Sequence, residues 1–471
     1  MAQRLNSIGG QRVLSLFNNR SSRRGAMMQI GALGGCGLAD QLAVAASSPA
    51  VLKERSVVFL FLHGGPSQIE TFDPKMTAPA GIRSATGEVS TQTPGITFGG
   101  TFERLAERSD KFTVVRSFTT GNGNHDIKPV VSDASRKASI GSIYSRVAGT
   151  TNPSNGMPTN VTLFPRSVDS ERQPANMNFG RFDSTGSLGS AYSPFVPGSG
   201  GPFQESMQLN LPVDRMDNRQ QLLASLDLLK READASGMLE GVDQFRQQAF
   251  DTIVGGAAEA FDLSHESPEM LRRYDTAPLL PPDRISRRWN NYNNYVDNAK
   301  TLGKLLLMSR RLVERGCGFV TVTTNFVWDM HADANNATVE EGMRYMGNPL
   351  DHALSAFIDD LEARGLRDKV LVVCCGEMGR TPRINARGGR DHWGGLAPLL
   401  FYGGGTNPGA VIGQSTTDAA KPQSEPWHID NLLATVFHSL FDLGRLRLEQ
   451  RLPVDLVRLM TGSPPISGVL S

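Results

Sequence analysis

The sequence predicts an α/β fold built on a mostly parallel central sheet. Several short, β-branched apolar runs are continuous rather than alternating, which is typical of strands buried on both faces of a parallel sheet. Segments with helical spacing of apolar residues lie between these runs, and this alternation favours a doubly wound arrangement. The expected strands are residues 56–62, 112–115, 161–164, 319–324, 370–375 and 398–401.

Three segments show the helical spacing, and two of them end in the same way. Residues 291–315 and 349–365 each run into an Arg-Gly pair, which is the usual chemistry of a helix C-terminus. The third segment, 214–256, contains clustered leucines with charged residues between them. We expect a helix or a pair of helices in each segment.

One large domain accounts for most of the chain. Residues 165–213 are rich in Gly, Pro, Ser and Asn and are expected to form a long surface excursion. The length that remains after a leader is removed suits a single large α/β domain at 51–471, with a helical insertion at about 200–310.

The composition excludes several classes of protein. The chain has 471 residues, with 48 Lys and Arg against 47 Asp and Glu, so its formal net charge is +1. A dedicated nucleic-acid-binding protein would carry a basic surplus, so we expect no nucleic-acid partner. Four cysteines in this length exclude a disulfide-stabilised scaffold. No apolar run reaches the roughly 18 residues of a transmembrane helix, so we expect no membrane span.

The first fifty residues have the pattern of an export signal. Residues 1–24 contain five arginines, the last two adjacent, and no acidic residue. A glycine-rich, weakly apolar stretch follows at 26–38, and small residues follow at 43–46. The paired arginines and the modest apolar stretch indicate the twin-arginine route. We therefore expect residues 1–50 to be a signal and the mature protein to be periplasmic or extracellular.

Two other interpretations of the leader stay open. Residues 33–36, Leu-Gly-Gly-Cys, resemble a lipoprotein box, which would make Cys36 an acylated lipid anchor. The small residues at 43–46 compete with this as the processing site. A disordered basic arm is the third interpretation.

Polar side chains follow or flank most of the expected strands. They are His63 and Glu70 after the first strand, Thr120 and His125 after the second, Asp329 and His331 after the fourth, Glu377 and Arg380 after the fifth, and Arg390, Asp391 and His392 before the sixth. Ligands of open α/β sheets bind outside the carboxyl ends of the strands, so these side chains are expected to converge on one site.

The residue types in this set point to a divalent metal. Asp329 and His331 are two residues apart, so an extended backbone directs both side chains the same way. Carboxylates and imidazoles together suit Zn²⁺, Mn²⁺, Ca²⁺ or Mg²⁺, and the sequence leaves the identity of the ion open. Arg380 and Arg390 offer planar donors for a tetrahedral anion.

Structural roles compete with these assignments. Glu377 favours a site, because a carboxylate beside a buried strand is costly unless it is paired or metal-bound. His392 is favoured as well, since Asp391 could orient its ring. His125 could equally be a hydrogen-bonding residue of a loop. For Glu70, a structural role and a role in the site are equally favoured.

Several sequence blocks resemble the DUF1501 family of exported bacterial proteins of the planctomycete type. The matching blocks are HGGPSQ at 63–68, TFDPK at 71–75, VRS at 115–117, AFDL at 260–263, WDMH at 328–331, GEMGRTP at 376–382 and GRDHW at 389–393. The last two are the most specific, and the resemblance extends from about residue 22 to the end of the chain.

The DUF1501 family in turn resembles the alkaline phosphatase and sulfatase superfamily. This implies an alkaline-phosphatase-like three-layer sandwich with a metal site at the strand ends. By position, Asp329 and His331 resemble one ligand pair, Glu377 replaces a later Asp-His pair, and His392 resembles the late histidine ligand. The full set of candidate metal ligands is Glu70, Asp329, His331, Glu377, Asp391 and His392.

Two departures from the superfamily leave the function divided between two hypotheses. The early aspartate after the first strand is His63 here, and the sulfatase signature of Cys or Ser followed by x-Pro-x-Arg is absent after residues 112–115. The first hypothesis is a metal-dependent hydrolase of a small-molecule or glycan phosphate or sulfate ester, with Thr120, His125 and Arg380 as catalytic candidates. The alternative is a catalytically degenerate extracytoplasmic binding protein that keeps the fold, with or without a metal site.

Overall fold

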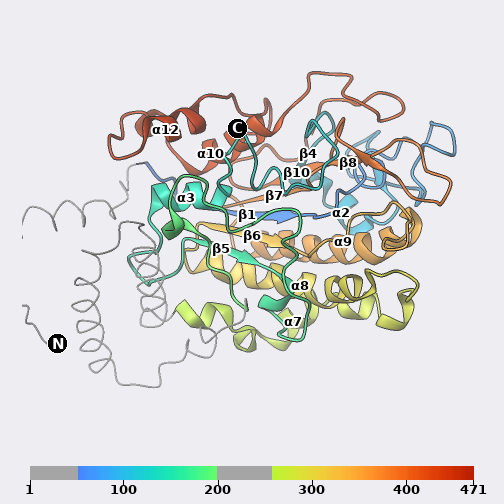
Figure 1. Cartoon of the computed structure of the whole chain (residues 1–471), viewed down its shortest axis with the longest axis horizontal. Helices are drawn as coiled ribbons and strands as arrows, with labels where there is room; N and C mark the ends of the chain where they lie inside the picture. Colours follow the sequence, from blue (N-terminus) through green and yellow to red (C-terminus); the bar gives the residue numbers. More distant parts are fainter. Residues whose placement is uncertain (1–50, 199–256) are drawn as a thin grey trace, which may run out of the picture. The chain divides into compact units, whose positions relative to one another are not determined.

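A seven-stranded sheet forms the middle of this computed structural model, which describes residues 51–198 and 257–471 (Figure 1). The spatial order of the strands is β11-β4-β10-β7-β1-β6-β5, and only β10 runs against its neighbours. The strands are β1 (Ser56–Phe61), β4 (Phe112–Val115), β5 (Asn160–Leu163), β6 (Phe319–Thr323), β7 (Val370–Cys375), β10 (Leu399–Tyr402) and β11 (Val411–Ile412). The predicted mostly parallel sheet is confirmed, and so are all six expected strands, to within one residue at either end.

Helices cover both faces of the sheet, so the fold has the three predicted layers (Figure 1). Two long helices, α8 (Tyr292–Glu314) and α9 (Val339–Ala363), pack on one face, together with α2 (Glu103–Ala106) and α7 (Pro268–Tyr274). The other face carries α3 (Ile140–Ala148), α10 (Ile429–Leu440), α11 (Leu443–Leu446) and α12 (Val454–Thr461). Two small antiparallel pairs of strands lie outside the main sheet, β2 (Glu88–Ser90) with β3 (Thr97–Gly99) and β8 (Gly379–Arg380) with β9 (His392–Trp393).

The strands are buried on both sides, as their continuous apolar runs require. The neighbouring Cys374 and Cys375 of β7 show this directly, since their side chains join the hydrophobic cores on opposite faces of the sheet. Both thiols are free and buried. They pack as small apolar residues, which is the usual role of a buried free cysteine.

Helix α9 begins ten residues before the apolar pattern predicted. Its N-cap is Thr338, whose side chain accepts a hydrogen bond from the Glu341 amide at 3.2 Å. The helix continues through Pro349 and ends at Ala363, before Gly365 with φ +65°. The Arg-Gly pair therefore predicted the C-terminus of the helix correctly. The first turns were missed, because a proline is unusual in the interior of a helix.

Parts of the predicted organisation lie outside the described residues. These are the expected signal at 1–50 and the helical segment at 214–256. The described end of the predicted insertion includes α8, which packs on the sheet as part of its helical layer. No helix within residues 51–198 and 257–471 is long and apolar enough to cross a membrane.

Candidate metal centre

The site candidates gather where β1, β4, β6 and β7 end. These strands run in the same direction, so their carboxyl ends share one edge of the sheet. The carbonyl of His63 accepts hydrogen bonds from the amides of Val327 and Trp328 at 3.1 and 3.0 Å, which ties the end of β1 to the loop after β6. Gly64 permits this close approach, because its φ is +117° and a Cβ there would lie 2.6 Å from the Asp329 nitrogen.

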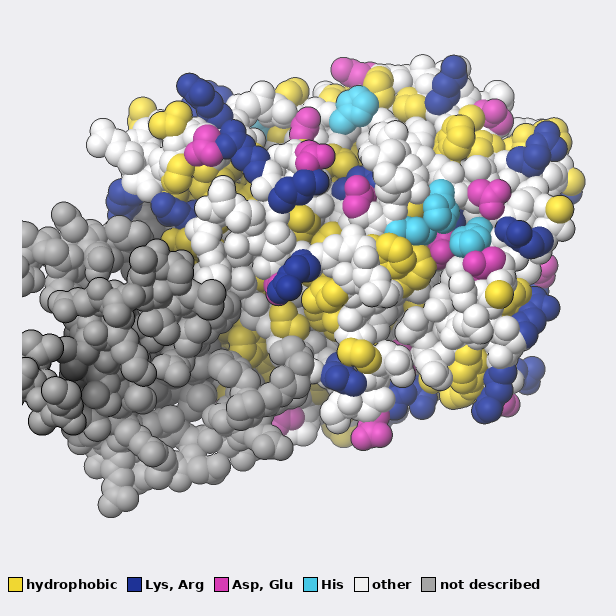
Figure 2. Space-filling model, viewed as in Figure 1, with side chains coloured by type: hydrophobic (Ala, Val, Ile, Leu, Met, Phe, Trp, Pro, Cys, Tyr) yellow, Lys and Arg dark blue, Asp and Glu magenta, His cyan; other side chains and the backbone are white. Residues whose placement is uncertain are grey.

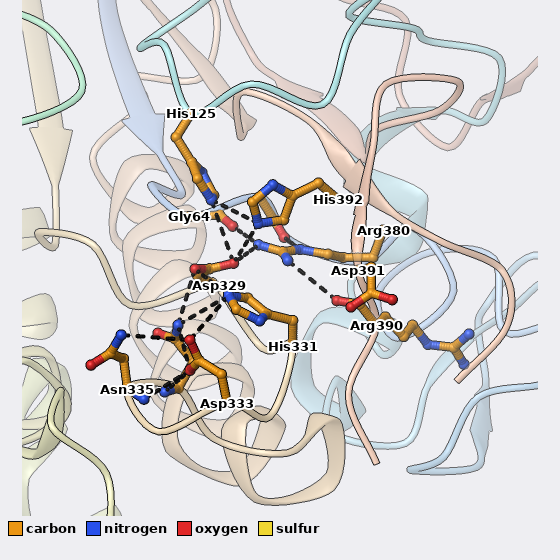
Figure 3. A network of polar contacts seen from close by, with 12 residues as sticks. Gly64, His125, Asp329, His331, Asp333, Asn335, Arg380, Arg390, Asp391 and His392 are labelled. Carbon is orange, nitrogen blue, oxygen red and sulfur yellow. Dashed lines mark hydrogen bonds and ion pairs between the residues drawn. The ribbon is translucent and has the colours of Figure 1, made fainter. Parts of the chain in front are cut away.

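Three potential ligand atoms meet at this edge, from His125, Asp329 and His392 (Figure 3). The Nε2 atoms of the two histidines are 3.0 Å apart. Asp329 Oδ1 lies 3.5 Å from Nε2 of His125 and 3.2 Å from Nε2 of His392. We call these three residues the ligand triangle.

The dimensions of the ligand triangle fit a divalent metal ion. In a tetrahedral zinc site with bonds of about 2.0–2.1 Å, neighbouring ligand atoms are roughly 3.3 Å apart. The three separations in the triangle, 3.0, 3.2 and 3.5 Å, bracket that value. The side chain of His392 is 37% exposed, so the triangle is open to solvent on one side. Three protein ligands with an open position are typical of catalytic metal sites.

Glu377 lies behind His125 rather than within the triangle. Its Oε1 is 2.9 Å from Nδ1 of His125, the ring nitrogen that faces away from the other ligands. The same carboxylate accepts the Gly64 amide, at 2.9 and 3.1 Å from its two oxygens. Burial lowers the pKa of His125, but its contacts with Asp329 and Glu377 raise the pKa overall. Because a carboxylate accepts, the contact with Glu377 places a proton on Nδ1, and Nε2 is the ring nitrogen directed at the other two residues of the triangle.

Arg380 is the buried partner of Asp329. Its Nη2 donates to Asp329 Oδ1 at 2.6 Å and also to the Gly64 carbonyl, its Nε donates to the Gly65 carbonyl at 2.7 Å, and its Nη1 donates to the Arg390 carbonyl at 3.3 Å. Burial alone would raise the pKa of Asp329, but the charge of Arg380 and the contacts with the surrounding histidines hold it well below its usual range. Asp329 is therefore ionised.

His331 contacts the other oxygen of the same carboxylate. Its Nε2 is 3.0 Å from Asp329 Oδ2 and 3.8 Å from Asp333 Oδ2. The Asn336 amide also donates to Asp329 Oδ2, at 3.1 Å, and its own oxygen accepts from Asn291 at 2.7 Å. The carboxylate of Asp329 is thus held on both sides, with one oxygen in the triangle and the other in this polar group (Figure 3).

His63 lies beside the triangle in an aromatic environment. Its ring is fully buried and lies 5.2–5.8 Å from the ring centres of Phe61, Phe179, Phe182 and Phe326. Neither ring nitrogen has a hydrogen-bond partner among the described residues. Burial lowers its pKa to about 4, so this histidine is neutral at neutral pH.

Two predicted metal ligands are engaged elsewhere. Glu70 is fully buried and accepts from Arg390 at 2.8 and 3.0 Å, from the Ser84 hydroxyl at 2.7 Å and from the Ala85 amide. A buried carboxylate with this many donors is a structural ion pair, and it also occupies Arg390, one of the predicted anion-binding residues. Asp391 accepts from the Asn385 amide at 3.0 Å and does not orient the His392 ring.

Thr120, one of the catalytic candidates, makes no side-chain hydrogen bond to the triangle in the described structure. Its hydroxyl is buried and lacks a hydrogen-bond partner there. The neighbouring Thr119 donates to the carbonyl of Gly394, two residues after His392, at 2.8 Å. The segment therefore packs against the loop that carries His392 and does not present a hydroxyl to the ligands.

Sequence reasoning missed the residues that brace the site. Lys128 is buried, and its ammonium donates to Asn122 Oδ1 and the Asn124 carbonyl at 2.9 Å each and to the Asp126 carboxylate. All three acceptors lie in the loop that presents His125. A lysine three residues after a candidate ligand, in a loop rich in Asn and Gly, was the available signal.

Comparisons with solved structures show weak similarity to ester hydrolases. The PsFucS1 sulfatase from Pseudoalteromonas sp. is 9% identical, with a TM-score of 0.31 over 85% of this chain and 70% of that one. The phosphonate monoester hydrolase SpPMH from Silicibacter pomeroyi is 10% identical, with a TM-score of 0.32 over 82% and 73%. A TAB5 alkaline phosphatase mutant is 11% identical, with a TM-score of 0.25 over 77% and 95%. The case for function therefore depends on the geometry of the site itself.

A search of curated proteins found no match. The family comparison is more informative, because one family model matches residues 54–446, which is most of the chain. The blocks that carried the resemblance in the sequence lie within this range, and the ligand triangle is built from three of its loops. The chain belongs to the DUF1501 family, described as proteins of unknown function.

Proposed function

We propose that this protein is an exported, metal-dependent hydrolase of a phosphate or sulfate ester. The observation that carries the proposal is the ligand triangle, in which two imidazole nitrogens and one carboxylate oxygen lie 3.0–3.5 Å apart with one side open to solvent. Three inward-facing ligands at the carboxyl edge of an α/β sheet are what a hydrolytic metal site requires. The substrate would be a small-molecule or glycan ester.

Each residue around the triangle has a separable task in this proposal. A divalent ion bound there would act as a Lewis acid on the ester and lower the pKa of water. His125, Asp329 and His392 would hold the ion, and Glu377 would keep the His125 ring in the binding tautomer. Arg380 keeps Asp329 ionised. Each guanidinium nitrogen of Arg380 already contacts a protein acceptor and the side chain is buried, so in this proposal Arg380 positions Asp329 and does not act on the substrate.

The attacking group in this proposal is water. The Thr120 hydroxyl makes no hydrogen bond to the triangle, and the exposed side of His392 gives solvent direct access. A hydrolase that uses water directly forms no covalent enzyme intermediate, in contrast to one that uses a side-chain nucleophile. Absence of a burst of the first product would support this assignment, and a burst equal to the enzyme concentration would contradict it.

A binding protein without turnover is the second candidate. It is favoured by two observations, the contact of all three Arg380 guanidinium nitrogens with protein acceptors and the aromatic burial of His63 where a superfamily aspartate is expected. Such a protein would keep the metal and bind the anionic ligand without transforming it.

Metal analysis and ester assays on the purified mature protein separate the two candidates. The hydrolase predicts about one bound ion per triangle and turnover of aryl phosphate or aryl sulfate, both strongly reduced in Glu377→Ala. Bound metal without turnover would favour the binding role. Protein that binds no divalent ion and hydrolyses neither ester would contradict both.

The export part of the proposal rests on the leader alone and has its own test. Replacing Arg23 and Arg24 by lysine should retain the precursor inside the cell, because the twin-arginine route reads that pair. Export of the double-lysine variant at the normal level would contradict this route. Replacing Cys36 by alanine tests the lipid anchor, since an acylated protein would then leave the membrane fraction.

A further inference from the structure

An aromatic pair stands beside the ligand triangle. The rings of Phe179 and Phe326 are stacked, with centres 4.4 Å apart and planes inclined by 26°. Both rings also contact the imidazole of His125, with centres 5.1 and 4.6 Å from it. The two phenylalanines come from different parts of the chain, one from the expected surface excursion and the other from the loop after β6.

The excursion is fixed at this place by specific contacts. Asn325, which precedes Phe326, accepts the Asn176 amide at 3.2 Å and donates to the Pro174 carbonyl at 3.3 Å. Phe182 of the same excursion is buried and packs edge-on against Phe61. The segment that carries Phe179 is therefore anchored on both sides of that residue, and the position of its ring is defined.

The aromatic pair is not closed off from solvent. Phe326 is buried, whereas Phe179 is only half-buried, and Met177 two residues earlier is 38% exposed. Met177 is one of only four large hydrophobic side chains that are exposed among the described residues. Figure 2 shows hydrophobic side chains directly beside the histidine group on this face of the molecule. Exposed apolar surface next to a polar site is typical of a ligand-binding surface.

We propose that Phe179 and Phe326 form a platform for the alcohol part of the substrate, which is a ring with an apolar face. This inference rests on the proposed function, because the anionic part of the ester would lie at the ligand triangle. The ring next to the ester bond would then stack on Phe179, since the platform begins at the edge of His125. An arene and the C–H face of a sugar ring share this chemistry.

Equilibrium binding of phosphonates tests the platform separately from turnover. The metal-loaded protein would be titrated calorimetrically with methylphosphonate, phenylphosphonate and a hexose 6-phosphate analogue in which a methylene group replaces the ester oxygen. We expect at least one ring compound to bind about tenfold more tightly than methylphosphonate. Preference for phenylphosphonate would identify an arene, and preference for the hexose analogue would identify a sugar. Equal affinity for all three would overturn the platform.

Variants of Phe179 assign the preference to the platform. Phe179→Ala should remove most of the tenfold preference and leave methylphosphonate affinity unchanged, whereas Phe179→Trp should retain it. Leu279→Ala, at an exposed apolar side chain elsewhere on the surface, is the control. Ring preference that persists in Phe179→Ala would overturn the assignment.

The outcomes also separate this inference from the proposed function. Ring-dependent binding without ester turnover would support the platform while contradicting the hydrolase. Turnover of methyl and phenyl phosphate with equal kcat/KM, and equal binding of the three ligands, would support the hydrolase while contradicting the platform.

Discussion

The Nε2 atoms of His125 and His392 face each other at 3.0 Å, with Asp329 Oδ1 beside both. A cation between the three would use the lone pairs of both nitrogens, whereas without it only one proton can lie between them. We therefore expect His125→Ala and His392→Ala each to abolish stoichiometric metal binding, measured as metal content after desalting.

A distant histidine provides the control for this first prediction. His438→Ala, on α10, should retain the metal content of the unchanged protein. Full metal content in both triangle variants would show that the ion is bound elsewhere.

Glu377 is expected to act on metal affinity through the His125 ring. Glu377→Gln should weaken metal binding about 10- to 100-fold, as is usual when a carboxylate behind a ligating histidine is removed. Asp391→Asn is the matched control, because Asp391 is adjacent to His392 in sequence but bonds to Asn385. Competition with a chromogenic chelator measures both. Equal losses in the two variants would contradict the assignment.

Lys128 should act on the site by holding the loop that presents His125. Lys128→Met removes a buried ammonium with three acceptors in residues 122–126, so the loop should become mobile. We expect weaker metal binding and faster proteolysis in this loop, read from the cleavage sites by mass spectrometry. Lys137→Met, an exposed lysine, should change neither property. Unchanged metal affinity in Lys128→Met would contradict the positioning role.

Arg380 and Arg390 each form a buried ion pair, and only the pair of Arg380 includes a residue of the triangle. Arg380 pairs with Asp329 of the triangle, and Arg390 pairs with Glu70 away from it. Replacing either arginine by methionine should lower the free energy of unfolding by about 3–5 kcal/mol, because a buried carboxylate loses its partner.

Added metal should distinguish the two arginine variants. An ion bound beside Asp329 supplies a new countercharge, so metal should raise the melting temperature more in Arg380→Met than in Arg390→Met. Arg380→Lys, which keeps the charge, should respond as the unchanged protein does. Identical metal responses in both methionine variants would contradict the proposed link between Arg380 and the triangle.

The fold was more predictable from sequence than the roles within the site. The strands were predictable because burial on both faces forces continuous apolar runs, as in β7. The convergence of His125, Asp329, Glu377 and His392 followed from a general rule about strand ends. The separate roles of these four residues could not be predicted in this way, since only the side-chain directions show that Glu377 contacts Nδ1 of His125.

Buried ion pairs, in which one charged side chain neutralises another, were the main reason why the sequence misassigned site residues. Glu70 resembled a ligand in sequence, and its pairing with Arg390, 320 residues later in the chain, depends on tertiary contacts that no local pattern encodes. Phe179 lay in a segment without periodicity, so nothing in the sequence indicated that it would stack on Phe326.

Asp351 lies in α9, apart from the triangle residues in sequence, and its carboxylate caps α2. The free energy of unfolding should depend on pH through this residue. Its carboxylate accepts the amides of Arg104 and Leu105 at 3.0 and 2.8 Å. Burial raises its pKa to about 6, and the two amide hydrogen bonds only partly oppose this. A raised carboxyl pKa means that the neutral form is favoured in the folded state. The contribution of Asp351 to stability is therefore complete below its unfolded pKa of about 3.9 and is lost as the pH rises through 6.

Urea unfolding of the unchanged protein and of Asp351→Asn at several pH values measures this effect. The stability difference between them should fall by about 2–3 kcal/mol from pH 4 to pH 7.

Asp359→Asn, on the same helix, should show the opposite slope. Burial raises the pKa of Asp359, but its hydrogen bonds and ion pair with Arg108 lower it overall, so its contribution is present above its unfolded pKa and is lost in acid. Parallel pH profiles for the two variants would contradict the assignment, because burial dominates the pKa of Asp351 and pairing with Arg108 dominates the pKa of Asp359, and these two effects act in opposite directions.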